Sequence, residues 1–112
     1  MAQLLPLGIA TPGHHMWSIV GEDAVEVGSL WLGPGGDRAR GACGIFDIEV
    51  HPEARGRGHG RAALAALEPV ARALGYEEIG LHVFGDNDVA RRLYRTSGYI
   101  ETDVSMVRSL RA

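Results

Sequence analysis

The stretch Ile45-Phe-Asp-Ile-Glu-Val-His-Pro-Glu-Ala-Arg-Gly-Arg-Gly-His-Gly-Arg61 decides how the rest of the chain is arranged. Its first residues alternate between apolar and acidic side chains, which is typical of a half-buried strand with Phe46, Ile48 and Val50 on one face. Pro52 ends this strand, because proline has no N–H group to donate to a sheet. A glycine-rich turn and a segment rich in Ala and Leu follow. The stretch therefore predicts a strand, a turn and a helix, in that order.

The turn combines three glycines with three arginines, and this composition favours an anion-binding site. Glycine lets the backbone adopt left-handed dihedral angles and lets a ligand approach closely. The first N–H groups of a helix have no partner within the helix, and the helix dipole makes that end electropositive. Arginine adds forked hydrogen-bond donors and positive charge. Together these features predict that phosphates bind here, most simply as a pyrophosphate.

Two common phosphate-binding motifs do not fit the turn. A phosphate-loop NTPase needs a Gly-Lys-[Ser/Thr] sequence, and the chain contains no lysine. The dinucleotide fingerprint needs its third glycine three positions after the second, whereas Gly60 follows Gly58 by two. On the residues of the turn alone, a basic, flexible surface loop that contacts RNA remains open as an alternative.

Two motifs in the chain resemble the GCN5-related N-acetyltransferase (GNAT) family. Arg55-x-x-Gly58-x-Gly60, after a strand that ends in Glu-Val, is similar to the acyl-CoA-binding signature of the family. The stretch from Leu81 to Tyr99, with its Asn, its Ala, its Leu-Tyr pair and its closing Gly-aromatic pair, is similar to the second conserved stretch. The resemblance implies an N-acetyltransferase that moves an acetyl group from acetyl-CoA to an amine by direct attack on the thioester. A non-catalytic acyl-CoA-binding module or fragment is the alternative.

The resemblance also implies the architecture. We expect an α/β fold with a mixed, mostly antiparallel central sheet, a splayed pair of parallel strands that admits the pantetheine arm, and two flanking helices. The N-terminus is expected to be truncated, because a hairpin starts near His15 and leaves no room for the strand and helices with which full members begin. Without that neighbour, the strand His15–Gly21 would present an open edge, which predicts self-association as a homodimer.

The other elements follow from hydrophobic periodicity and from breaker residues. Met1–Gly13 is expected to be irregular, and Tyr99–Ser109 to form one strand or two short ones. The strands expected between them are His15–Gly21, Val25–Leu32, Ala42–Val50 and Ile79–Phe84, and a second helix should run from Asn87 to Gly98. The helix after Gly58 carries an apolar stripe that faces the sheet, made of Leu64, Leu67, Ala71 and Leu74.

Composition limits the class of protein. The 112 residues predict a single domain, and the net charge of −3 argues against a strongly cationic nucleic-acid binder. The single cysteine, Cys43, excludes an internal disulfide and suits a reducing compartment, so we expect a cytoplasmic protein. No apolar run reaches membrane-spanning length, and neither a nucleic acid nor a membrane is expected as partner.

By resemblance, acetyl-CoA is the co-substrate and several groups of the chain would hold it. The backbone of Glu49–Val50 would pair with the pantetheine arm, N–H groups from Arg57 to Arg61 would hold the pyrophosphate, and Asn87 would contact the arm from across the cleft. The residues expected at this site are Ile48, Glu49, Val50, Arg55, Gly56, Arg57, Gly58, His59, Gly60, Arg61, Asn87 and Tyr94.

Tyr94 resembles the general acid of the family, although on its spacing alone it could equally fill the seam between helix and sheet. The general base stays open. Glu49 lies on the polar strand face, His82 lies on the adjoining strand, and Asp47 is a third candidate, while a water chain could replace all three. The acceptor is expected to be the amine of a small molecule or a peptide.

Metal binding is not expected. His14 and His15 are adjacent and would point to opposite faces of a strand. His51, His59 and Cys43 show no ligand spacing.

Overall fold

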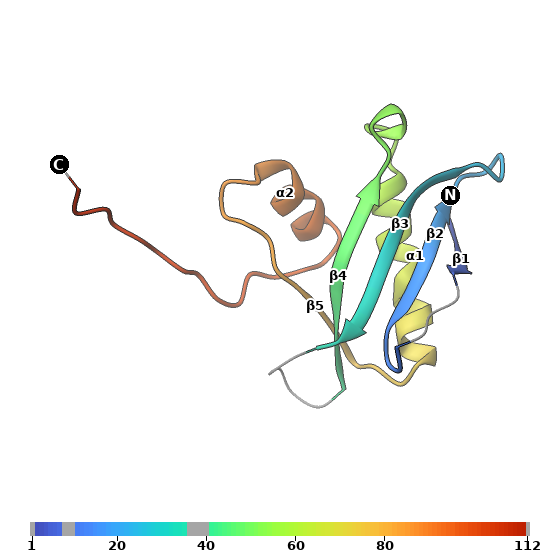
Figure 1. Ribbon diagram of the computed structural model, residues 1–112, viewed down its shortest axis with the longest axis horizontal. Coiled ribbons are helices and arrows are strands. Elements are labelled where there is room, and N and C mark those ends of the chain that lie inside the picture. Colours follow the sequence, from blue (N-terminus) through green and yellow to red (C-terminus); the bar gives the residue numbers. More distant parts are fainter. Residues whose placement is uncertain (1, 8–10, 36–40, 112) are drawn as a thin grey trace.

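The computed structural model describes residues 2–7, 11–35 and 41–111 of the chain. Five strands form one sheet, helix α1 covers one of its faces, and α2 lies beside β4 where β5 departs (Figure 1). The elements in chain order are β1 (Gln3–Leu7), β2 (His15–Val20), β3 (Glu26–Pro34), β4 (Ala42–Val50), the short 3-10 helix η1 (Pro52–Ala54), α1 (His59–Ala73), β5 (Glu78–Leu81) and α2 (Asp88–Thr96).

The sheet is mixed and mostly antiparallel, as expected. Its strands follow the order β1-β2-β3-β4-β5, and only β4 and β5, which α1 connects, are parallel. The irregular N-terminus predicted for Met1–Gly13 is wrong over Gln3–Leu7, which pairs with β2 along its whole length. Pro6 argued against a strand in the sequence, but proline is tolerated on an edge strand such as β1. The open edge predicted for His15–Gly21 is therefore wrong as well, since β1 covers it.

Strand β4 contains a bulge that changes which side chains share a face. Leu32 pairs with Ile45 and Trp31 pairs with Asp47, so Phe46 is an extra residue on β4. Phe46 consequently lies on the same face as Asp47, and the prediction that it shares a face with Ile48 and Val50 is wrong. We call this face, which lies opposite α1, the outer face of the sheet.

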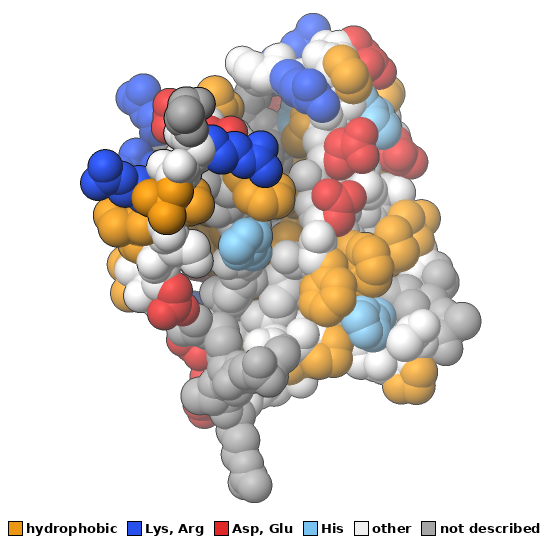
Figure 2. All heavy atoms as spheres, turned by 60° about the vertical axis from the view of Figure 1, so that its left-hand side comes forward, with side chains coloured by type: hydrophobic (Ala, Val, Ile, Leu, Met, Phe, Trp, Pro, Cys, Tyr) orange, Lys and Arg blue, Asp and Glu red, His pale blue; other side chains and the backbone are white. Residues whose placement is uncertain are grey.

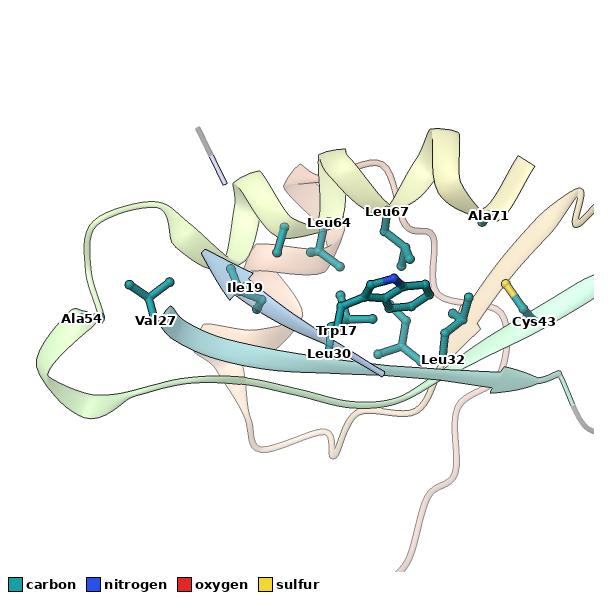
Figure 3. Packing of buried hydrophobic residues seen from close by; sticks show 12 residues of the cluster. Trp17, Ile19, Val27, Leu30, Leu32, Cys43, Ala54, Leu64, Leu67 and Ala71 are labelled. Atoms are coloured by element: carbon teal, nitrogen blue, oxygen red, sulfur yellow. The ribbon is translucent and has the colours of Figure 1, made fainter. Parts of the chain in front are cut away.

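The core lies between α1 and the inner face of the sheet. Leu64, Leu67 and Ala71 on α1 are buried as predicted, and they pack over the strands (Figure 3). Leu74, the fourth residue of the predicted stripe, is instead exposed, because it already forms the C-cap of the helix. The core residues contributed by the strands include Trp17, Ile19, Val27, Leu30, Leu32, Cys43 and Ile45.

The parallel pair separates after a short stretch of pairing. Ala42–Ile45 pairs with Glu78–Leu81, whereas the residues of β4 from Phe46 to Val50 have no strand beside them on the β5 side. The strand predicted for Ile79–Phe84 therefore ends three residues early, at Leu81. This separation begins at the bulge and opens toward the glycine-rich turn.

The strand predicted for Tyr99–Ser109 is wrong, because residues 100–111 form no helix or strand. The segment leads away from the sheet (Figure 1), and its apolar side chains are 71% to 96% exposed. Near its beginning, Arg91 and Glu101 form an ion pair with a nitrogen–oxygen distance of 2.6 Å. The apolar residues exposed on it are Ile100, Val104, Met106, Val107 and Leu110.

Candidate active site

The turn before α1 has the left-handed backbone that its glycines predict. Gly56 has a φ angle of +78°, and Gly58, the N-cap of α1, has a φ angle of +82°. A Cβ atom at either position would meet no neighbour within 4 Å, so the backbone conformation rather than crowding is what requires glycine there.

The N-terminus of α1 is open to an anion. The first backbone bond of the helix runs from the Ala62 N–H to the Gly58 carbonyl at 3.0 Å. This leaves the N–H groups of His59, Gly60 and Arg61 without a partner inside the helix. No side chain caps this end, and its first turn holds no acidic residue. The positive end of the helix dipole therefore meets no carboxylate of α1 itself.

Two of the three arginines in the turn are held by other parts of the chain. Arg55 donates from Nε to the Val50 carbonyl at 2.9 Å, which fixes the turn to the end of β4. Arg61 donates to the backbone oxygen of Thr96 at 3.3 Å and to its hydroxyl at 2.8 Å, which joins α1 to α2. These guanidinium groups position the turn, while Arg57 lies exposed at its tip.

The candidate groups on β4 face in different directions. Ile48 and Val50 are half-buried and pack against the core, whereas Asp47 and Glu49 are exposed on the outer face. Their register partners on β3 are Trp31 for Asp47 and Ser29 for Glu49. The separation of β4 from β5 leaves the backbone beside these carboxylates free to pair with an extended amide chain.

Tyr94 lies half-buried on α2, and its ring packs edge-on against Tyr99 with ring centroids 5.9 Å apart. Burial raises the pKa of Tyr94, and the negative charge of Asp47 raises it further. The hydroxyl therefore keeps its proton at neutral pH. Asp47 is therefore near enough to Tyr94 for its charge to act on the hydroxyl.

Tyr99 is a residue that the sequence reasoning did not place at the site. Its hydroxyl oxygen is buried and has no hydrogen-bond partner within the described part of the chain. Burial is the main reason that the pKa of Tyr99 rises to about 12. The Gly98-Tyr99 pair that closes α2 was the available signal, because a left-handed glycine there turns the following ring back onto the helix.

His82 lies just beyond β5 rather than on it, and it is exposed. Its ring packs edge-on against Phe84 at a centroid distance of 5.5 Å. His82 and Tyr94 line the same hollow, which lies between β5, α2 and the C-terminal segment, whereas Glu49 does not line it. The three predicted catalytic residues therefore divide between two sides of the β4–β5 gap.

Asn87 caps α2, as the sequence predicted. Its side-chain oxygen accepts a hydrogen bond from the Ala90 N–H at 3.2 Å. Its amide nitrogen keeps two donors that this cap does not use.

Cys43 lies in the core, where its thiol donates to the Glu78 carbonyl at 3.4 Å and burial raises its pKa. Such a thiol has little nucleophilic character at neutral pH. The residues that the structure describes contain no cluster of three His, Cys, Asp or Glu side chains able to hold a metal ion. None of the described helices is both long enough and apolar enough to span a membrane.

Comparison with known proteins agrees with this geometry. Residues 4–99 match the family model for the acetyltransferase (GNAT) family. The chain therefore belongs to the GNAT family, a class that uses acetyl-CoA as acyl donor. Family membership supports acetyl-CoA-dependent N-acetyl transfer as its activity and lends no support to the non-catalytic alternative.

Two relatives come from Bacillus subtilis (strain 168), and both are described as uncharacterised N-acetyltransferases. YycN is 40% identical over 96% of this chain and 69% of its own length, and YdgE is 32% identical over 96% of this chain and 68% of its own. The crystal structure of YycN, a putative acetyltransferase, superimposes with a TM-score of 0.82 at 38% identity, covering 91% of this chain and 65% of that one. The chain thus spans about two thirds of the length of these relatives.

A more distant structure supports the fold alone. The aminoglycoside N-acetyltransferase AAC(6')-Iy, solved with a bisubstrate analogue that contains CoA, superimposes with a TM-score of 0.72 at 18% identity. The match covers 91% of this chain and 72% of that one.

Proposed function

We propose that this protein binds acetyl-CoA between β4 and α2 and transfers the acetyl group to the amine of a small molecule or peptide. The observation that carries the proposal is the open N-terminus of α1 behind the left-handed Gly56 and Gly58. It lies at the end of a strand whose last five residues have no partner on the β5 side. An open helix end attracts phosphates, and an unpaired strand edge accepts an amide-containing arm.

Each predicted binding group would contact a different part of acetyl-CoA. The N–H groups of His59, Gly60 and Arg61 would hold the pyrophosphate, and the exposed Arg57 would add positive charge. The backbone of Glu49–Val50 would pair with the pantetheine arm. The amide nitrogen of Asn87 would donate to the arm from the opposite side of the gap.

The transfer itself needs one base and one acid. The amine nitrogen attacks the thioester carbonyl carbon, a C–N bond forms, and the C–S bond breaks. The base takes the proton that the amine loses, and the departing thiolate receives a proton or a hydrogen bond from Tyr94. Because a thiol titrates about 1.5 units below an ordinary tyrosine, and burial widens that gap, Tyr94 acts chiefly as a hydrogen-bond donor until sulfur carries a full charge.

Among the three candidate bases we place Asp47 ahead of Glu49 and His82. Its carboxylate acts on Tyr94 electrostatically, so base and acid flank the same gap. Glu49 lies two residues further along the outer face, and His82, which lines the same hollow as Tyr94, lies beyond the end of β5.

Calorimetry of acetyl-CoA binding tests the phosphate site. Gly60→Asp would bring a carboxylate to the phosphates and should weaken binding about a hundredfold, or about 2.7 kcal/mol. Gly60→Asn is the matched control, because it crowds Leu93, which a Cβ atom would meet at 3.3 Å, without adding charge. Equal affinities of the two variants would contradict the site. Thiol release with a panel of amines then separates a transferase from a protein that only binds acyl-CoA.

We also propose a cytoplasmic homodimer. The single cysteine suits a reducing compartment, and residues 100–110 expose five apolar side chains and form no strand. Like β1, β5 is an edge strand of the sheet, and this segment of a second copy would pair as a strand with its outer edge. Light scattering over a range of concentrations tests this, and a stable monomer at high concentration would contradict it.

A further inference from the structure

The outer face of the sheet carries an apolar row that runs across the strands to the site. Leu7 on β1 pairs with Met16 on β2, Met16 pairs with Trp31 on β3, and Trp31 pairs with Asp47 on β4. All three apolar side chains are partly exposed, with 36% exposure for Trp31, and Phe46 beside them is 51% exposed. Large apolar side chains gathered on one exposed face are typical of a binding surface.

Three rings at the end of this row form an ordered cluster, which we call the aromatic cluster (His14, Trp31 and Phe46). The centroid of the Phe46 ring lies 5.1 Å from that of Trp31 and 5.2 Å from that of His14. The indole N–H of Trp31 donates to His14 Nδ1 at 3.0 Å, so a neutral His14 carries its proton on Nε2. These contacts fix the rings relative to one another before any ligand binds.

Gly33 makes room for the aromatic cluster. A Cβ atom at this position would lie 2.7 Å from His14 Nδ1 and 3.0 Å from a Phe46 ring carbon. A side chain there would displace both rings. The cluster thus depends on a backbone position without a side chain, which indicates a shaped surface rather than a chance grouping of exposed residues.

Negative charge borders the cluster on the side of the site. Asp47 lies directly opposite Trp31, and Glu49 follows on the same face. Figure 2 shows acidic side chains beside a band of hydrophobic side chains and a histidine. Carboxylates next to aromatic faces attract cations, both by charge and by the electron density of the rings.

We propose that the aromatic cluster is the acceptor platform, and that the acceptor is a protonated amine joined by a short linker to a flat apolar or aromatic body. The body lies on Trp31 and Phe46, and the amine docks at Asp47 as the ammonium, which releases one proton to solvent before the neutral nitrogen attacks the thioester. The inference rests on the proposed transferase function and adds the class of acceptor. Asp47 connects the two parts, because its charge also reaches Tyr94 across the gap.

A second copy of the chain is a poorer occupant of this face. A two-fold contact places a surface against itself, so Asp47 and Glu49 would approach the same carboxylates of the other copy. A cationic ligand neutralises this charge instead.

Acetylation kinetics with two amines test the platform. 2-Phenylethylamine and butylamine both carry one ammonium group, but only the first has a ring. We expect the KM for 2-phenylethylamine to be about tenfold lower, which corresponds to about 1.4 kcal/mol. Phe46→Ala should remove most of that preference, with little effect on the KM for butylamine or on acetyl-CoA affinity. Leu5→Ala is the matched control, because Leu5 is an exposed apolar residue of the same sheet face in the neighbouring register row.

Calorimetry of 2-phenylethylamine binding in the presence of CoA gives a readout that needs no turnover. We expect Asp47→Asn and Phe46→Ala each to weaken this binding at least about fivefold, or about 1 kcal/mol. Equal KM values for the two amines, with turnover intact, would overturn the platform and leave the proposed function standing. Absence of turnover with amine binding intact would overturn the proposed transferase function and leave the platform standing as a binding surface. An effect of Phe46→Ala on oligomeric state alone would assign this face to self-association and would also overturn the proposal.

Discussion

The two faces of the sheet differ in what covers them, and the difference separates stability from function. On the inner face, α1 buries Leu30, Leu32 and their neighbours almost completely. On the outer face, Trp31 lies between those two leucines in sequence, yet it remains partly exposed beside Asp47. Strand β3 thus supplies the core with one set of alternate residues and the candidate acceptor surface with the other. Substitutions on the inner face should change the free energy of unfolding, and those on the outer face should change the kinetics of acetyl transfer.

The largest expected effect tests the inner face. Leu67→Ala removes a side chain of α1 that has no exposed surface and leaves a cavity against the strands. We expect a loss of about 2–5 kcal/mol in the free energy of unfolding, measured by denaturant titration. Leu5→Ala on the outer face should cost well under half of that. Equal losses would show that both faces contribute to stability and would break the comparison.

The next effect tests the chemistry beside the outer face. Tyr94→Phe keeps the ring but removes the hydroxyl, so turnover should fall about a hundredfold, or about 2.7 kcal/mol, with acetyl-CoA affinity nearly unchanged. Steady-state kinetics and calorimetry on the same sample measure both quantities. Turnover equal to that of the unmodified protein would show that Tyr94 only packs against Tyr99.

The smallest effect concerns Tyr99, which packs against the core. The pKa of Tyr99 is about 12 in the folded protein, against about 10 for an unfolded chain. Above pH 10 the unfolded chain loses this proton first, so stability is full below pH 10 and falls as the pH rises toward 12. Tyr99→Phe should remove the part of this stability loss that Tyr99 causes. A smaller loss should remain, because the pKa of Tyr94 is also raised.

At neutral pH, the same variant should be as stable as the unmodified protein or up to about 1 kcal/mol more stable, because it removes a buried hydroxyl that lacks a partner. Unfolding followed at neutral pH and near pH 11 checks both statements. An unchanged pH dependence would show that Tyr99 is more hydrated than its burial indicates.

Local patterns made β4 and the glycine-rich turn predictable. Ala42–Val50 has the boundaries predicted from its alternation, and Gly58 immediately precedes α1 as the composition of the turn required. The direction of Phe46 was not predictable, because a bulge is a property of two paired strands and β4 alone does not reveal it. The short β1 escaped notice for a related reason, since an edge strand that contains Pro6 has a weak signal of its own.

The candidate catalytic groups show the same limit. Tyr94 was found from its motif, but the proposed role of Asp47 rests on its closeness to Tyr94, a residue of another element, which no local pattern records. The C-terminal segment gives the opposite case. Its apolar residues favour a strand, yet a strand forms only where a neighbour accepts its backbone hydrogen bonds.

The bulge at Phe46 also determines which neighbouring side chains of β4 can share a face of the sheet. A regular strand sends consecutive side chains to opposite faces, so an aromatic ring and a carboxylate cannot be next to each other in sequence and share a face. The extra residue removes that restriction, and Phe46 and Asp47 stand together on one side. Deleting Phe46 would remove the bulge and restore regular alternation, so Asp47 and Glu49 would stay on the outer face and Ile48 and Val50 would stay toward α1, but the ring beside the carboxylate would be lost.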